Sequence, residues 1–229
     1  YEITYGDWSS DVCSSDLFSI MAELLQSGGW LIIPLLLASV LALAIVAERY
    51  WALRRSVVVP SHLVEQILRW HHERQLNHET IAQLHHSSPL GRMLAAGLLN
   101  RNHPREVMKE SLEESGRHEV HEMERYLSTL GTIAAGAPLV GLLGTVIGMI
   151  KVFDAITLGG VGDPAVLSTG ISEALISTAT GLSVAIPSLI FYRLLKRKVD
   201  ELVVEMEQAA IRVVEIIHGD RELGEYKQP

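Results

Sequence analysis

Residues 127–150, with the sequence LSTLGTIAAGAPLVGLLGTVIGMI, form an uncharged run of 24 residues. As an α-helix such a run is about 36 Å long, which is enough to cross a hydrocarbon core of about 30 Å. A buried core helix of a soluble protein would be an alternative for one run alone. Residues 30–47 and 174–192 form two more uncharged runs, of 18 and 19 residues. Three such runs predict an all-α membrane protein with three transmembrane helices.

The composition of the 229-residue chain agrees with apolar residues gathered in blocks. The chain is 48% hydrophobic and 20% charged, with a mean hydropathy of +0.23, which excludes a disordered or collagen-like chain. A single cysteine excludes a disulfide scaffold and a Cys-based zinc site. A net charge of −8 argues against nucleic-acid binding by bulk charge. The motifs G-x-x-x-x-G-K-[ST], G-x-S-x-G and H-E-x-x-H are absent from the sequence, so we predict no enzyme and no cofactor.

The first twenty residues differ from the rest of the chain. Residues 7–17, DWSSDVCSSDL, resemble a common short-read sequencing adapter translated in frame, so we interpret residues 1–20 as a non-native leader and exclude them from the fold. A genuine Ser/Asp-rich tail is the alternative. Removing this segment changes the net charge from −8 to −4, because it holds four acidic residues and no Lys or Arg. It also removes Cys13, the one cysteine.

Basic residues near the ends of the three runs predict their orientation. Seven follow the first and third runs: Arg49, Arg54, Arg55, Arg193, Lys196, Arg197 and Lys198. The link at residues 154–172 has no Lys or Arg, while Lys151 can reach the interface from the end of the second run. We therefore expect the N-terminus outside and the C-terminus in the cytoplasm.

These assignments divide the chain into nine segments. They are the leader 1–20, a short outer lead 21–29, transmembrane helix 30–51, a cytoplasmic helical segment 52–126, transmembrane helix 127–153, an outer loop 154–168, transmembrane helix 169–192, a cytoplasmic C-terminal helix 193–218 and the tail 219–229.

The cytoplasmic segments have helical patterns. Pro104 followed by Arg105 and Glu106 is typical of a helix start. After the third run, apolar residues alternate spacings of four and three along a seam: Leu195, Val199, Leu202, Met206, Ala209, Val213 and Ile216. The seam predicts that the third span continues as one long helix, which packs either on other subunits or on its own chain. The nine histidines at positions 62–121 are interpreted as part of a solvated helical face, although metal binding stays open.

Two groups of residues in the apolar runs are candidate functional residues. Small residues and one proline mark a helix-packing face on the second run, which we expect to hold subunits together: Pro138, Gly141, Gly144 and Gly148. Glu173 is the one carboxylate at the edge of the third run. It is either an interfacial residue that marks the end of the span or a functional intramembrane acid.

Two motifs carry a resemblance to a known family. Residues 137–148, APLVGLLGTVIG, and residues 170–182, GISEALISTATGL, followed by Ala185-Ile186-Pro187, resemble the second and third spans of the MotA/TolQ/ExbB proton-channel family. The resemblance covers residues 21 to about 219 and is closest to the short ExbB members.

The resemblance implies a pentamer of three-span subunits around a central pore in a bacterial inner membrane. It also implies an ExbD-like single-span partner in that pore, a TonB-like protein as the recipient of the work, and a polar pathway for protons at Glu173, Thr145 and Thr178. A TolQ-like subunit, a MotA-type stator and a non-conducting membrane scaffold remain alternatives.

We expect that deletion of residues 1–20 leaves membrane insertion and activity unchanged, because nothing in this segment can contribute a buried core. The measurement is membrane fractionation and transport activity of the shortened and full chains. Failure of the shortened chain to insert would contradict the adapter interpretation.

Overall fold

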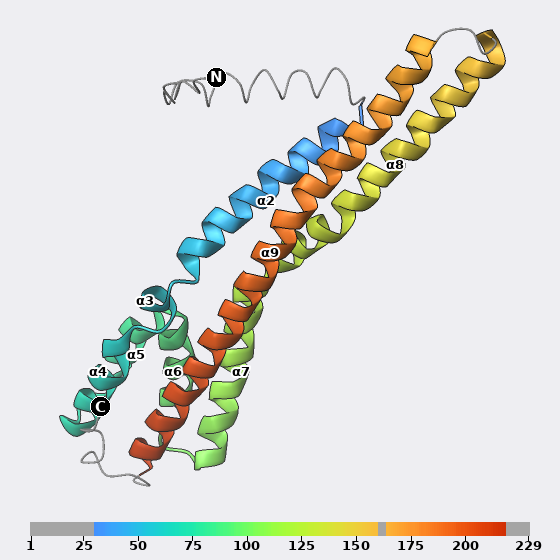
Figure 1. Cartoon of the computed structure of the whole chain (residues 1–229). Coiled ribbons are helices and arrows are strands. Elements are labelled where there is room, and N and C mark those ends of the chain that lie inside the picture. The colour runs from blue at the N-terminus through green and yellow to red at the C-terminus, as the bar shows by residue number, and fades with distance from the viewer. Residues whose placement is uncertain (1–29, 160–163, 219–229) are drawn as a thin grey trace, which may run out of the picture. The chain divides into compact units, whose positions relative to one another are not determined.

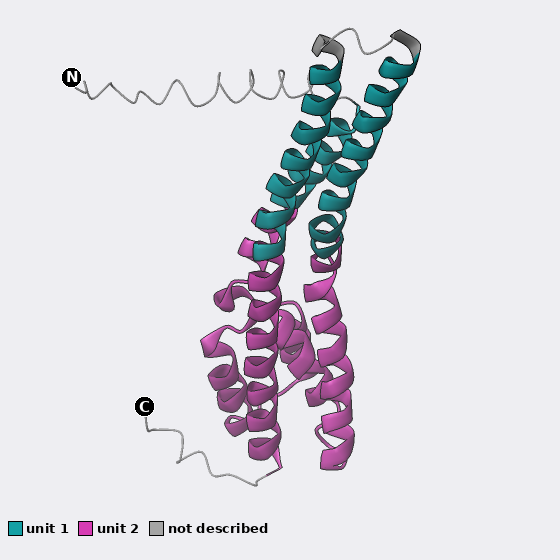
Figure 2. Ribbon diagram, turned by 45° about the vertical axis from the view of Figure 1, so that its right-hand side comes forward, with its two compact units in different colours: residues 1–43, 130–190 teal, residues 44–129, 191–229 magenta. Residues whose placement is uncertain are grey.

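The computed structural model describes residues 30–159 and 164–218, and all of the regular structure in these ranges is helical. The proposed leader 1–20, the lead 21–29 and the tail 219–229 lie outside the described residues. Two compact units divide the chain. Unit 1 contains residues 30–43, 130–159 and 164–190, and unit 2 contains residues 44–129 and 191–218. Figure 2 shows the units in different colours.

Three long apolar helices confirm the prediction of three candidate membrane spans (Figure 1). They are α2 (Ile32–Ala52), α8 (Leu127–Gly159) and α9 (Pro164–Ile217). Each has a stretch long and apolar enough to cross a membrane. Helices are favoured there because the backbone hydrogen bonds are satisfied within the segment. The 54 residues of α9 form one unbroken helix that continues beyond the third apolar run, as the seam predicts.

Unit 1 consists of parts of these three helices. Its core is small: Leu35 of α2, Ala137 of α8 and Ala185 of α9 are buried together, with Val140 and Val184 packed against them. The outward faces carry large apolar side chains that are mostly exposed in the isolated chain, including Leu37, Leu139 and Leu175 at 63–68% exposure. An apolar exterior of this kind suits lipid or neighbouring membrane helices.

Unit 2 contains five shorter helices together with the parts of α2, α8 and α9 that lie outside unit 1. They are α3 (Arg55–Val58), α4 (Ser61–His72), α5 (His78–His85), α6 (Pro89–Leu99) and α7 (Arg105–Glu124). Helix α7 begins directly after Pro104, as predicted. Helix α6 begins with Ser88 as its cap, whose hydroxyl accepts a hydrogen bond from the Gly91 amide at 3.0 Å, and with Pro89 in its first turn.

The seam of α9 is buried within its own chain. Six of its seven members, Leu195, Val199, Leu202, Met206, Ala209 and Val213, are at most 6% exposed in unit 2, and Ile216 is half-buried. Of the two alternatives, packing on its own subunit is therefore the one that holds. Packing of the seam on other subunits, the other alternative, does not hold, because the chain's own helices already cover it.

Helices α6 and α7 are joined by an ion pair whose carboxylate is almost fully buried. Arg92 donates two hydrogen bonds to Glu119, from Nε to Oε1 at 2.7 Å and from Nη2 to Oε2 at 2.5 Å. The Glu119 side chain is 5% exposed. The hydrogen bond that Arg92 donates to Glu119 raises the pKa of the Arg92 guanidinium. Around the pair the helices pack closely, because Gly97 lies against Leu112 and Gly116 lies against Met93.

We expect Arg92→Met to destabilise unit 2 by about 3–5 kcal/mol, because it leaves the buried carboxylate of Glu119 without its partner. The measurement is the unfolding midpoint of the full chain in detergent. Lys198→Met is the matched control: Lys198 pairs with Glu201 at 3.4 Å with both side chains more than two-fifths exposed, and such surface pairs contribute about 0–1 kcal/mol. Equal midpoints for the two variants would contradict this role of Arg92.

Candidate functional site

The close contact between α8 and α9 in unit 1 positions the candidate residues. A Cβ added at Gly141 would lie 3.1 Å from the Thr178 Cα, and one at Gly181 would lie 2.7 Å from the Ala137 carbonyl oxygen. A Cβ at Gly148 would lie 2.8 Å from the Ala174 Cβ. Residue numbers rise along α8 as they fall along α9 in these contacts, so the helices are antiparallel. Only residues without large side chains permit backbones to approach this closely.

The predicted helix-packing face therefore lies between two helices of one chain. Gly141, Gly144 and Gly148 all face α9, while Pro138 is half-buried inside α8. In the sequence this face was expected to hold subunits together. The structure corrects that expectation, because the glycine surface is already occupied by α9 and is not free for a second copy.

The two candidate threonines are both bound to backbone carbonyls. The Thr178 hydroxyl donates across the helix contact to the Gly141 oxygen at 3.1 Å. The Thr145 hydroxyl donates within its own helix to the Leu142 oxygen at 2.6 Å, as hydroxyls in apolar helices usually do. Within the described ranges, neither is hydrogen-bonded to Glu173.

Glu173 is paired with Lys151, a contact that the sequence did not predict. Its Oε1 accepts a hydrogen bond from the Lys151 Nζ at 2.7 Å, and the side chains are 20% and 51% exposed respectively. Lys151 was expected to extend to the membrane interface. The missed signal was positional: Lys151 directly follows the second apolar run and Glu173 directly precedes the third. Because a short link joins these antiparallel helices, both residues lie at the same end of the pair.

Ser177, one turn after Glu173 on α9, is a second residue that the prediction did not include. It is 1% exposed, and its Oγ has no hydrogen-bond partner among the described residues. Its side chain occupies the space that a side chain at Gly144 would need. A buried hydroxyl without a partner is costly, so Ser177 is held there by the close packing of α8 and α9.

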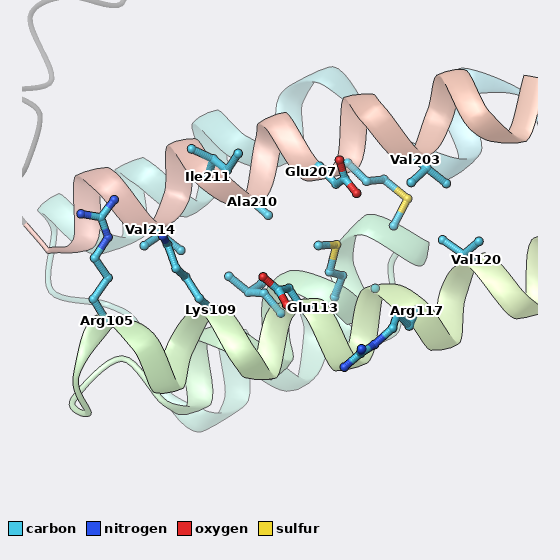
Figure 3. Close-up of a pocket in the computed structure, with 14 residues that line it drawn as sticks. Arg105, Lys109, Glu113, Arg117, Val120, Val203, Glu207, Ala210, Ile211 and Val214 are labelled. Atoms are coloured by element: carbon cyan, nitrogen blue, oxygen red, sulfur yellow. The ribbon is translucent and has the colours of Figure 1, made fainter.

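Unit 2 contains a groove of about 660 Å³ between α7 and α9. Figure 3 shows charged side chains of α7, among them Arg105, Lys109 and Glu113, opposite the apolar Ala210 and Ile211 of α9. Glu173, Thr145 and Thr178 do not line this groove. Within the described part of the chain, no three His, Cys, Asp or Glu side chains gather as metal ligands.

Comparisons with known proteins agree with the motifs of the apolar helices. The pattern of the MotA/TolQ/ExbB proton channel family matches residues 85–208. An ExbB-like biopolymer transport protein (ExbB-like 1) of Synechocystis is 38% identical over 171 residues, which cover 73% of this chain and 67% of that relative. The biopolymer transport protein exbB1 of Vibrio cholerae is 29% identical over 198 residues, 82% of this chain and 84% of its own.

The chain therefore belongs to the MotA/TolQ/ExbB family of membrane proton channels, which are transport proteins rather than enzymes. This confirms the resemblance seen in the sequence. With three candidate spans, it is a multi-pass membrane protein.

We expect Gly144→Ala to destabilise unit 1 and Gly136→Ala to stabilise it slightly. Both glycines lie in α8, and alanine is favoured over glycine in a helix by about 1 kcal/mol. At Gly136 nothing lies within 4 Å of an added Cβ, whereas at Gly144 the added methyl group collides with the Ser177 side chain. The measurement is the thermal midpoint of each variant in detergent. A Gly144→Ala midpoint at or above that of Gly136→Ala would contradict the described α8–α9 contact.

Proposed function

We propose that this protein is the channel-forming subunit of a bacterial inner-membrane energiser. With an ExbD-like single-span partner, it converts the proton motive force into mechanical work for TonB-dependent transport across the outer membrane. It assembles as a homopentamer, with its N-terminus in the periplasm and its C-terminus in the cytoplasm. Family membership and the ExbB names of the similar proteins support this proposal.

The observation that carries the proposal is the half-buried carboxylate of Glu173 in an apolar unit. The charged residues of the described part of unit 1 are Lys151, Asp154 and Glu173. An acid at the edge of a membrane span is costly and is usually retained for function. Glu173 also lies within the GISEAL motif that resembles the family's third span, where a proton-pathway residue is expected.

The driving force is set by the membrane potential. One proton moving through 100 mV releases about 2.3 kcal/mol. Glu173 would exchange protons or pair with a partner carboxylate, while the Thr145 and Thr178 hydroxyls would contact water or a passing proton. Because both hydroxyls are bound to carbonyls of the helix pair, they contribute less to this pathway than the carboxylate does.

We expect Glu173→Ala to abolish proton flux and siderophore uptake while the oligomer still assembles. Thr145→Ala and Thr178→Ala should reduce flux only partly, because each removes a hydroxyl and no charge. The measurements are proton flux in vesicles that contain the chain with its ExbD-like partner, siderophore uptake in cells, and native mass spectrometry of the assembly. Normal uptake by an assembled Glu173→Ala variant would show that the carboxylate only marks the end of the span.

A further inference from the structure

The ion pair between Lys151 and Glu173 joins α8 and α9 at one end of unit 1. The Nζ–Oε1 distance is 2.7 Å, which is the short distance expected of a charge-assisted hydrogen bond. Glu173 is the more buried partner, at 20% exposure, and Lys151 is half exposed. An uncompensated carboxylate in such an apolar place would be costly, so Lys151 supplies the charge that makes this position tolerable.

A second acid lies close to Lys151 in the sequence of α8. Asp154 lies three residues further along α8, the spacing at which helical side chains meet, and it is exposed. In the structure the lysine nevertheless pairs with Glu173 on the neighbouring helix. The described part of α2 in unit 1, up to residue 43, has no charged residue. The charge on Glu173 is therefore balanced from α8, whose other charged residue in the described part of unit 1 is Asp154.

We propose that Lys151 is a positioning residue that holds the Glu173 carboxylate against α8 and releases it when a proton arrives. This inference rests on the proposed function, because it concerns the same carboxylate. A proton that binds Oε1 of Glu173 cancels its negative charge, while Lys151 keeps its own three protons. The ammonium then turns toward Asp154, and the protonated Glu173 is free to face the partner.

The chemistry of lysine suits this exchange. Its ammonium is a point charge on a flexible four-carbon stem and is not locked by a bidentate geometry. With half of its side chain already exposed, moving it toward Asp154 requires little further change in solvation. A proton that binds the Glu173 carboxylate must therefore compete with the Lys151 ammonium for that carboxylate.

The first test measures how much the Lys151–Glu173 ion pair contributes to stability, and it needs no transport assay. Thermal midpoints in detergent are compared for the full-length chain, Lys151→Met, Glu173→Gln and the double variant. If the two side chains stabilise each other, the double variant melts no lower than the less stable single variant. Strictly additive losses would overturn the proposal. This result does not depend on whether the protein conducts protons.

The second test measures proton flux in vesicles that contain the chain and its ExbD-like partner. Lys151→Met should raise the basal flux about fivefold, because the proton no longer competes with an ammonium. Lys151→Arg, which keeps the positive charge, should restore flux to near the original value. Lys198→Met is the matched control, since it removes a lysine from an exposed pair in unit 2, and should change nothing.

Flux in Lys151→Met that is unchanged, or lost as in Glu173→Ala, would overturn the role of Lys151. So would an arginine variant that behaves like the methionine variant. Absence of flux in the original chain with its partner would instead contradict the proposed function. The thermal test would then still show whether Lys151 and Glu173 stabilise each other.

Discussion

The close approach of α8 to α9 is the contact on which the rest of unit 1 depends. Gly141, Gly148 and Gly181 allow the two backbones to meet with almost no side chain between them. Lipid tails are as apolar as the side chains of these helices, so the hydrophobic effect contributes little to helix association in a membrane. Close packing of this kind is therefore a main source of helix association. It also fixes the antiparallel register that brings Lys151 to Glu173 and the Thr178 hydroxyl to the Gly141 carbonyl.

Much of this fold can be predicted from the sequence because the membrane imposes strong rules. The three uncharged runs identify α2, α8 and α9, and the unbroken seam beyond residue 195 predicts the length of α9. Two things could not be predicted. Periodicity shows that the seam is apolar but not which surface covers it, and in the structure its own chain does. The pattern G-x-x-x-G likewise shows that a helix packs closely but not on which helix.

The candidate site could be predicted only in part, because its contacts join residues on two different helices. Glu173 is conspicuous as a carboxylate beside an apolar run, and the motifs around it resemble a known family. Its partner Lys151 is 22 residues away and was interpreted by itself, as a residue that reaches the interface. The outer loop between the two spans predicts that they are antiparallel, but pairing the two residues also requires knowing that α8 and α9 pack side by side. Ser177 was missed because a serine in an apolar helix usually bonds to its own backbone, whereas this one has no partner among the described residues.

Two of the ion pairs between helices show how the same charges can serve different purposes. Arg92 holds Glu119 through two hydrogen bonds, with the carboxylate almost fully buried. That geometry is rigid, and breaking it leaves a buried charge unpaired. Lys151 holds Glu173 through one hydrogen bond, with the lysine half exposed and Asp154 one turn away. A half-exposed lysine with one hydrogen bond is held less rigidly than an arginine with two, as the proposed exchange of a proton at Glu173 requires. The use of lysine rather than arginine in unit 1 is therefore consistent with a site that changes its charge, whereas the arginine of unit 2 suits a joint that does not.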